Sequence, residues 1–539
     1  MAWPAPADRA PVWLALALGA LTSLARVPFR SRYLFAWDSA NFALALDQYN
    51  VAFHQPQPPG YPMYVAAAGL ARRLTGEANA AYVTLSVIAS GLAVTFLVLA
   101  AHRLYGRRVA LLAAVLLATN TLSWGQGVVA YPYSFLACFT ALVAWLCLCI
   151  GQGAPRALAL LTGAVIGLAA GFRSELAPFL APLWLYACLR APGTRRHRLL
   201  AVAPGGVAMA LSIAAWYVPM VQLSGGWAAY QAATGGYYAY FIQTTSGAGK
   251  LLLGLLENTR ALVGFLYNGV GLALLPMVYF VGRFFAPQRL VRDWRARFVA
   301  VWLAPPLAFY VTVHIGNPGY VLSLLPALCI FAAQAVLGML EDVREAAGAL
   351  TTIPSHLGRG DLGSDASWRR ADQRIVTITW VVPAAWLVVL AIGLSNTALF
   401  LLANGEGRRQ EIRQIDRIFE RQLAEIEARF PPESTLIVSY DRSRQYRYYL
   451  PRHKIHLLFD VAVAGAVTDT SRYWERRATY RVPPGITAVL FPDLGRNTSD
   501  QPGIVERVDL GVGVDLYVAR VRAGDEVRYG YQYATGTRA

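Results

Sequence analysis

Long apolar blocks separated by short polar loops run through the first 402 residues of the chain. A helix that crosses a bilayer needs ~20 predominantly apolar residues, and these blocks approach or exceed that length. We therefore expect an all-α polytopic membrane domain over residues 1–402, with about eleven transmembrane helices. The predicted spans are residues 11–27, 80–101, 109–123, 131–151, 157–173, 175–190, 199–223, 261–285, 298–314, 319–340 and 375–402.

The pattern changes after residue 402. Apolar residues first recur at spacings of three and four, which predicts an amphipathic helix that ends at Pro431-Pro432. Short β-type runs follow at residues 435–440, 488–491 and 514–519. We expect residues 403–539 to form a small α/β domain. The apolar positions of its predicted helix are Ile412, Ile415, Phe419, Leu423 and Ile426.

Composition agrees with a membrane protein. Hydrophobic residues make up 56% of the chain and charged residues only 15%, against about a quarter charged in soluble proteins. The formal charge is +17, but the basic residues lie mainly in short loops between apolar blocks, as the positive-inside rule requires. The charge therefore indicates membrane orientation, and we expect no nucleic-acid partner.

Basic clusters predict which loops face the cytoplasm. Three clusters, at residues 103–108, 190–198 and 283–297, each follow an even-numbered span. The first apolar block has neither a strong basic region nor an obvious cleavage site, so we interpret it as a retained span. We expect a multi-pass protein of the inner (plasma) membrane. Its outer side would carry the first loop 28–79, the aromatic loop 224–260, the turn 314–320 and the C-terminal domain.

The first outer loop has an unusual local pattern. Residues 39–49 and 62–74 each predict a short amphipathic helix able to lie along the membrane surface. Between them, residues 54–62 read His-Gln-Pro-Gln-Pro-Pro-Gly-Tyr-Pro. Proline and glycine at this density fix a non-helical path. We expect a structured loop with two surface helices rather than a flexible connection.

Two carboxylates and a histidine in this loop are candidates for chemistry. Asp38 follows the first span and is a candidate general base for an acceptor hydroxyl, although Asp at such a position more often caps the next helix. Asp47 is either a second carboxylate of the site or a surface residue. His54 can bind a phosphate or orient a carboxylate, but a lone His is more often an ordinary interface residue.

These segments together resemble the C-type superfamily of membrane glycosyltransferases, and within it the bacterial branch related to protein mannosyltransferases and aminoarabinose transferases. The resemblance rests on Asp38, the two-helix loop with its 54–62 run, and two later segments. One is Gly-Phe-Arg-Ser-Glu at residues 171–175, and the other is the turn 314–320 before Leu325-Pro326. The branch often has an Asp-Glu pair at the catalytic position, whereas here Ser39 follows Asp38.

The resemblance implies a specific reaction. The donor would be a sugar carried on a polyprenyl phosphate and bound from the bilayer, and Asp38 would be the general base. Transfer would invert the sugar and reach an extracytoplasmic glycan, lipid or protein. Soluble nucleotide-sugar would not be used. The residues expected to bind substrate are Asp47, His54, Tyr61, Arg173, Glu175, His314 and Tyr320.

Physical chemistry independently favours Arg173. A lipid phosphate needs a cation at the membrane edge, and an ionisable residue beside a span is a functional candidate by default. Glu175 would orient Arg173 or simply neutralise it. The aromatic residues of loop 224–260 would stack on sugar or cover the prenyl chain, although an interfacial aromatic belt is the better explanation for most of them.

Other chemistries lack their sequence signals. The chain has no Asp-x-Asp pair and no His-Glu-x-x-His motif, and its five cysteines lie in apolar blocks without zinc spacing. We therefore name no metal and no cofactor. A transporter or flippase for a lipid-linked or cell-envelope substrate is the alternative, but no inverted repeat supports it. A structural scaffold would tolerate loss of Asp38, Arg173 and His314 together.

Overall fold

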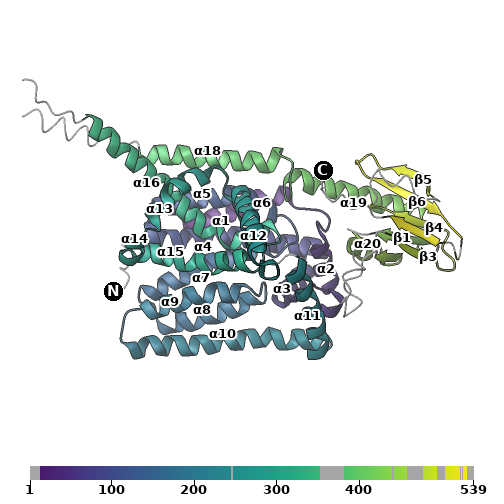
Figure 1. Ribbon diagram of the computed structural model, residues 1–539, viewed down its shortest axis with the longest axis horizontal. Coiled ribbons are helices and arrows are strands. Elements are labelled where there is room, and N and C mark those ends of the chain that lie inside the picture. The colour runs from purple at the N-terminus through teal and green to yellow at the C-terminus, as the bar shows by residue number, and fades with distance from the viewer. Residues whose placement is uncertain are drawn as a thin grey trace, which may run out of the picture.

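The computed structural model consists of a helical bundle and a small mixed sheet at one end of it (Figure 1). It describes residues 12–244, 247–351, 381–439, 442–457, 477–493, 504–522, 524 and 526–530. Each predicted apolar block coincides with at least one helix, except that residue 11 and residues 375–380 lie outside the described residues. The prediction of a mainly helical, multi-pass membrane protein with a small C-terminal sheet is confirmed.

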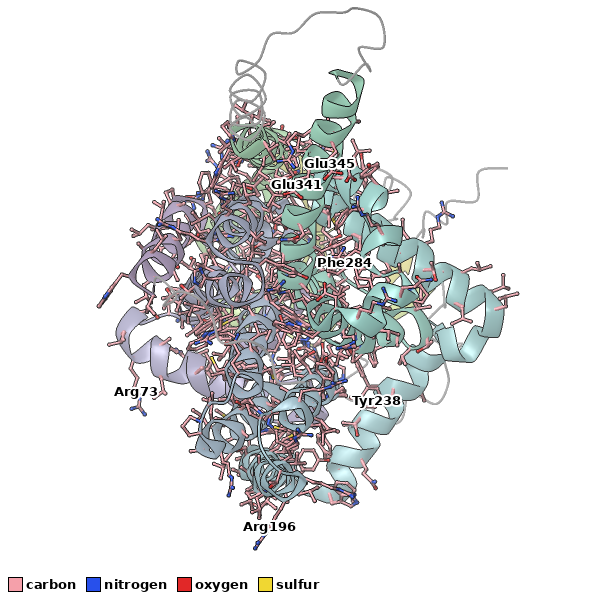
Figure 2. The ribbon with its side chains drawn as sticks, turned by 90° about the vertical axis from the view of Figure 1, so that its left-hand side faces the viewer. Arg73, Arg196, Tyr238, Phe284, Glu341 and Glu345 are labelled. Carbon is pink, nitrogen blue, oxygen red and sulfur yellow. The ribbon has the colours of Figure 1, made fainter. Side chains whose placement is uncertain are left out.

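Helices of the bundle pack around a central apolar helix, α4 (Ala78–Tyr105), which contacts α1, α5 and α7. A second layer forms where α8 packs against both α9 and α10. Figure 2 shows Phe284 enclosed among the helices and Arg196 at the outer edge of the bundle. The remaining helices of this part are α1 (Val12–Arg26), α2 (Trp37–Ala45), α3 (Pro62–Thr75), α5 (Arg107–Thr119), α6 (Thr121–Gln126), α7 (Tyr133–Gly151), α8 (Arg156–Ala170), α9 (Leu176–Arg190), α10 (Arg195–Leu223), α11 (Trp227–Thr244), α12 (Gly247–Val270), α13 (Leu274–Phe284), α14 (Pro287–Arg292), α15 (Trp294–Thr312), α16 (Leu325–Thr351) and α18 (Val381–Leu402).

Length decides which helices can cross a membrane alone. Seven helical stretches in the described part of the chain are long and apolar enough, whereas α8 and α9 are apolar but shorter. At 15 residues each, α8 and α9 reach only ~22 Å, against a hydrocarbon thickness of ~30 Å. The count of about eleven spans therefore stays a prediction. The seven stretches are Val12–Phe29, Ala78–Tyr105, Tyr133–Gly151, Arg198–Leu223, Leu252–Phe284, Leu325–Ala346 and Val381–Leu402.

Segment 224–260 differs from its prediction as an aromatic loop. It is largely helical, with α11 over its first half and the start of α12 over its second. No proline occurs between Pro219 and Pro276, so nothing in this stretch blocks the backbone hydrogen bonds of a helix. The alanine content of α11 also favours a helix. The prediction of a loop rested on the many aromatic residues of the segment, which do not exclude a helix.

The C-terminal domain has a five-stranded sheet in the order β2-β1-β4-β6-β5. Helix α19 (Arg409–Arg429) confirms the predicted amphipathic helix. It packs on one face of the sheet through Phe419 and Leu423. A second core on the other face of the sheet includes Leu436 and Tyr517. The three predicted runs correspond to β1 (Thr435–Ser439), β4 (Ala488–Phe491) and β6 (Asp515–Arg520); Tyr440 lies outside the described residues. Elements not predicted are α20 (Ser443–Tyr449), β2 (Lys454–Leu457), β3 (Arg477–Arg481), β5 (Ile504–Asp509) and β7 (Glu526–Gly530).

The three basic clusters gather at one end of the bundle. The Arg103 guanidinium donates to the side chain of Gln152, and the Arg295 guanidinium lies 5.7 Å from the ring of Tyr105. The connection from α9 to α10, which carries the second cluster, lies at this same end, and the sheet domain lies at the opposite end (Figure 1). Basic loops and sheet domain therefore occupy opposite ends of the helical bundle.

Candidate functional site

Asp38 lies in the first turn of α2, near the end of the bundle that carries the sheet domain. The N-cap residue of α2 is Ala36, which makes no side-chain cap hydrogen bond. Asp38 is therefore not the N-cap residue. The capping role predicted from the sequence is wrong because the helix begins at Trp37, two residues before the predicted start at residue 39.

Burial and one cation tune the Asp38 carboxyl group. Its side chain is only partly exposed, and burial raises the pKa of Asp38 to about 6, while the positive charge of Arg173 opposes the rise. The carboxylate charge adds to burial in raising the pKa of Tyr131, Tyr237 and Tyr320. Asp38 thus sits among phenol groups and one arginine, with a pKa suited to proton transfer near neutral pH.

Arg173 is the centre of the site. Its side chain is only 4% exposed, and its Nε donates to Glu175 Oε1 at 2.6 Å. The guanidinium also lies 4.7 Å from the ring centres of both Tyr133 and Tyr320, and 5.6 Å from that of Tyr61. Aromatic faces stabilise a buried cation, so one carboxylate and three rings hold this guanidinium in a fixed orientation.

Backbone contacts bring the separate segments of the site together. The Met63 N–H donates to the carbonyl of Gly171 at 3.0 Å, which joins the start of α3 to the turn that carries Arg173. Tyr310 Oη donates to the Tyr320 carbonyl at 2.9 Å and so fixes the turn before α16. These bonds place Tyr61 and Tyr320 against Arg173 from two different segments of the chain.

The proline-rich run 54–62 has two residues in the left-handed region, His54 with φ 53° and Tyr61 with φ 47°. Bulky residues rarely adopt this conformation, and when they do it is often at ligand sites. The His54 ring stands edge-on to Tyr237 at 5.8 Å. The His314 ring stands edge-on to Tyr320 at the same centroid distance, 5.8 Å. Both histidines therefore flank aromatic rings of the site.

Ser39 stands where the related branch often has a second acid. Its side chain is fully buried, and its Oγ donates to the Ala130 carbonyl at 3.0 Å. Helix α2 is further anchored by Tyr82, whose Oη donates to the Phe42 carbonyl at 2.8 Å. Ser39 thus serves to attach the helix, and Asp38 is the carboxylate that this helix presents to the site.

Asp47 takes no part in this cluster. Its carboxylate pairs with Arg72 at 2.7 Å, and its side chain is 57% exposed. The other residues expected from the sequence, namely Asp38, His54, Tyr61, Arg173, Glu175, His314 and Tyr320, are brought together by the contacts above. Tyr131 and Tyr133 belong to the site but were not expected. The signal for them was a Tyr-Pro-Tyr sequence at the start of an apolar block.

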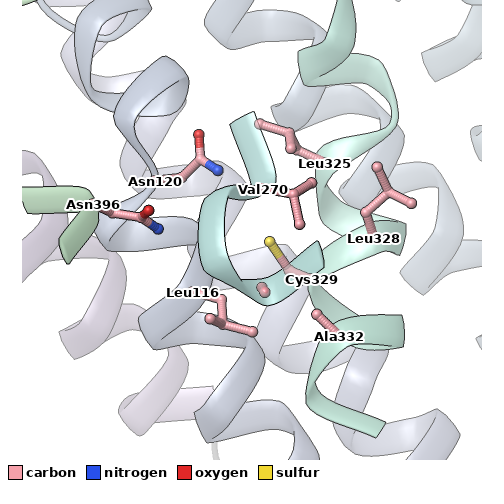
Figure 3. Close-up of a pocket in the computed structure, with 9 residues that line it drawn as sticks. Leu116, Asn120, Val270, Leu325, Leu328, Cys329, Ala332 and Asn396 are labelled. Carbon is pink, nitrogen blue, oxygen red and sulfur yellow. The ribbon is translucent and has the colours of Figure 1, made fainter. Parts of the chain in front are cut away.

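A separate pocket lies among the helices of the bundle and shares no residue with this cluster (Figure 3). The Asn120 amide, one of its polar groups, donates to the carbonyl of Gly269. Most of its lining is apolar, so it offers no group for charge chemistry. Its lining residues are Leu116, Asn120, Val270, Ala273, Leu325, Leu328, Cys329, Ala332 and Asn396. Among the described residues, no group of three or more His, Cys, Asp or Glu side chains is arranged to hold a metal.

Comparison with known proteins agrees with the resemblance seen in the sequence. The family model of dolichyl-phosphate-mannose-protein mannosyltransferases matches residues 55–218. Crystal structures of ArnT from Cupriavidus metallidurans, in the apo state and bound to undecaprenyl phosphate, each align with a TM-score of 0.56 at 16% identity, covering 95% of this chain and 99% of that chain. No curated protein sequence matches the chain. The match over residues 55–218 and the shared fold support the resemblance to the C-type superfamily of membrane glycosyltransferases, with protein mannosyltransferases and the aminoarabinose transferase ArnT among the similar proteins.

Proposed function

We propose that this chain transfers a sugar from a polyprenyl-phosphate lipid to an extracytoplasmic acceptor, with Asp38 as the general base and Arg173 as a ligand of the donor phosphate. The proposal rests mainly on one observation: a carboxylate with a raised pKa and a buried arginine surrounded by aromatic rings lie in the same cluster. Undecaprenyl phosphate, which is bound in one of the ArnT structures, has the phosphate chemistry that such an arginine recognises.

In the proposed reaction, an acceptor hydroxyl attacks the anomeric carbon of the donor sugar. Asp38 takes the hydroxyl proton as the new C–O bond forms. The bond between the anomeric carbon and the phosphate oxygen breaks, and polyprenyl phosphate leaves with both electrons of that bond. Arg173 stabilises the extra negative charge on the leaving phosphate. Attack opposite the leaving group inverts the configuration at the anomeric carbon.

The binding side of the site also has the residues that this reaction needs. Glu175 orients the Arg173 guanidinium through its 2.6 Å hydrogen bond. Tyr61 and Tyr320 present rings on which a sugar can stack, and the rings of His54 and His314 stand edge-on to Tyr237 and Tyr320. Each of these residues is proposed to bind substrate. Asp47 lacks a contact that would support the same proposal.

The pH dependence of transfer tests the role of Asp38. A base must be ionised to act, and with a pKa of about 6 Asp38 is about 90% ionised at pH 7 and about 10% at pH 5. We expect kcat/KM to fall roughly tenfold per pH unit well below pH 6, because kcat/KM reports the free enzyme. Steady-state transfer measured between pH 4.5 and 8 gives this profile.

An Arg173→Gln variant provides the control for this profile. The Arg173 charge lowers the pKa of Asp38, so its removal should move the acid limb to higher pH in whatever activity remains. An acid limb that stays in place in this variant, or a wild-type profile that is flat down to pH 5, would argue against Asp38 as the titrating base.

The proposal places the cluster and the C-terminal domain on the outer face of the inner membrane. The basic clusters and the sheet domain lie at opposite ends of the helical bundle. Because basic loops face the cytoplasm, this arrangement supports the proposed orientation. Reporter fusions at Gly405, directly after α18, should show extracytoplasmic activity, and fusions at Gly193, between α9 and α10, should show cytoplasmic activity. The reverse pattern would place the site on the wrong side of the membrane for an outer-face acceptor.

A further inference from the structure

The segment that leads into the Asp38 helix is held by side chains of the C-terminal domain. Asp416 Oδ1 accepts hydrogen bonds from the backbone N–H groups of Arg32, at 2.8 Å, and Tyr33, at 3.0 Å. Tyr449 Oη accepts from the N–H of Leu34 at 2.8 Å. Three successive backbone amides, four to six residues before Asp38, are thus fixed by a different domain of the chain.

Asp416 is built into this contact. Its side chain is fully buried, and its Oδ2 lies 3.3 Å from Arg413 and 3.9 Å from Arg32. A carboxylate is costly to bury unless hydrogen bonds and opposite charge satisfy it. The two amides and two guanidinium groups meet that requirement, so the geometry around Asp416 is strongly determined.

Aromatic packing extends the same contact. The Tyr33 ring stacks on Phe419 of α19 at 6.0 Å and stands edge-on to Tyr449 of α20 at 5.4 Å. The ring of Tyr33 is partly buried and packs against the core that α19 and α20 form. Close packing of an aromatic ring against its neighbours resists sliding of the attached backbone.

Arg444 contacts the loop on both sides of Asp38. Its side chain is buried, its guanidinium lies 5.6 Å from the ring centre of Trp37, and its Nη1 donates to the carbonyl of Phe53 at 3.4 Å. Trp37 is the residue before Asp38, and Phe53 precedes His54. Figure 1 shows α20 and α2 as neighbours where the bundle meets the sheet domain.

We propose that Asp416, Tyr449 and Arg444 are positioning residues for Asp38, and that the C-terminal domain acts as the rigid support of the first outer loop. The proposal rests on the proposed function, because it assigns a purpose to the domain only if Asp38 is the base. Misplacement of a reacting group by ~1 Å can cost ~100-fold in rate. A displaced segment 32–34 would move Asp38 relative to Arg173, which is held by other contacts.

The central test compares Asp416→Ala with Asp416→Asn. Alanine leaves both amides without an acceptor, so we expect kcat for sugar transfer to fall about 10- to 100-fold, with the donor KM changed less than about threefold. Asparagine keeps a carbonyl oxygen for the two amides and should restore most of kcat. Arg429→Ala is the matched control, because Arg429 pairs with Glu425 and Glu506 inside the domain and not with the loop.

Hydrogen exchange gives a readout independent of activity. The amides of residues 32–34 should exchange faster in Asp416→Ala than in the wild-type protein or in Arg429→Ala. If Asp416→Ala fails to fold, Tyr449→Phe removes only the acceptor of the Leu34 amide, and a similar fall in kcat at unchanged donor KM is expected. Unchanged kcat and unchanged exchange in the folded variants would overturn the proposal.

The two proposals fail in different ways. If Asp38→Asn retains transfer, the proposed function itself is wrong. If Asp38→Asn is inactive while Asp416→Ala, Tyr449→Phe and Arg444→Ala all transfer sugar normally, the catalytic assignment stands and only the positioning role of the C-terminal domain is lost.

Discussion

Replacing Asp38 with Asn should slow sugar transfer at least ~100-fold, because a positioned base typically contributes ~10²–10⁴-fold. Asn keeps the size of the side chain but cannot accept the hydroxyl proton. Asp38 lies in the first turn of α2 and is not its N-cap, so loss of its charge there should cost only ~0.3–1 kcal/mol of helix stability. We expect the variant to fold, insert into membranes and bind the lipid donor.

The measurement is sugar transfer by the purified, membrane-reconstituted variant, with donor binding followed in parallel. Asp47→Asn is the matched control, because Asp47 is an exposed carboxylate of the same loop that pairs with Arg72, outside the cluster. That control should transfer sugar at a near-normal rate. Near-normal transfer by Asp38→Asn would remove Asp38 as the base, and a loss in Asp47→Asn would direct attention to that residue.

Replacing Arg173 with Lys should weaken donor binding about tenfold or more although the charge is kept. Lys offers a point charge in place of the planar fork that binds a phosphate through two N–H groups. It also loses the contacts of a planar guanidinium with the rings of Tyr133 and Tyr320. Binding of a polyprenyl phosphate to the purified protein, measured by titration, checks this directly.

Arg72→Lys controls for the loss of an arginine outside the cluster. Arg72 forms an exposed pair with Asp47, and exposed pairs contribute ~0–1 kcal/mol, so its replacement should leave lipid affinity unchanged. Equal affinity in Arg173→Lys and the wild-type protein would exclude the phosphate contact. Glu175→Gln should lower affinity less than Arg173→Lys, because Glu175 acts on the donor only by orienting Arg173.

Hydrophobic patterning predicted most of the helices because a membrane span requires a long apolar block whatever its neighbours are. The same rule failed at α11, where Ala, Gly and Tyr give no continuous apolar block yet nothing prevents a helix. In the C-terminal domain, a short strand such as β2 has only four residues. Its sequence, Lys-Ile-His-Leu, becomes a strand through parallel pairing with β1, which no local pattern reveals.

Site residues were predicted where a local sequence motif itself indicates chemistry. They were missed where only contacts between distant segments bring a residue to the site. Arg173 and Tyr320 lie far apart in the sequence, and their juxtaposition was expected only through the family resemblance. Tyr133 lies within the predicted span 131–151, near its start, although its ring faces Arg173. Asp47 shares a loop with Asp38, but the loop turns its carboxylate to Arg72 at the surface. The hydrogen bond from the Arg32 amide to Asp416, which supports the segment before α2, joins residues 384 positions apart.

The central claim is that this chain breaks the bond between a sugar and a polyprenyl phosphate and passes the sugar to an acceptor. One measurement tests it most directly: the wild-type protein in sealed vesicles is supplied with a polyprenyl-phosphate sugar labelled in the sugar, together with envelope extract as acceptor. We predict acceptor-dependent release of free polyprenyl phosphate, with the label recovered on the acceptor and its anomeric configuration inverted. Movement of the intact labelled lipid across the vesicle membrane, without release of polyprenyl phosphate, would contradict the account and identify the protein as a transporter.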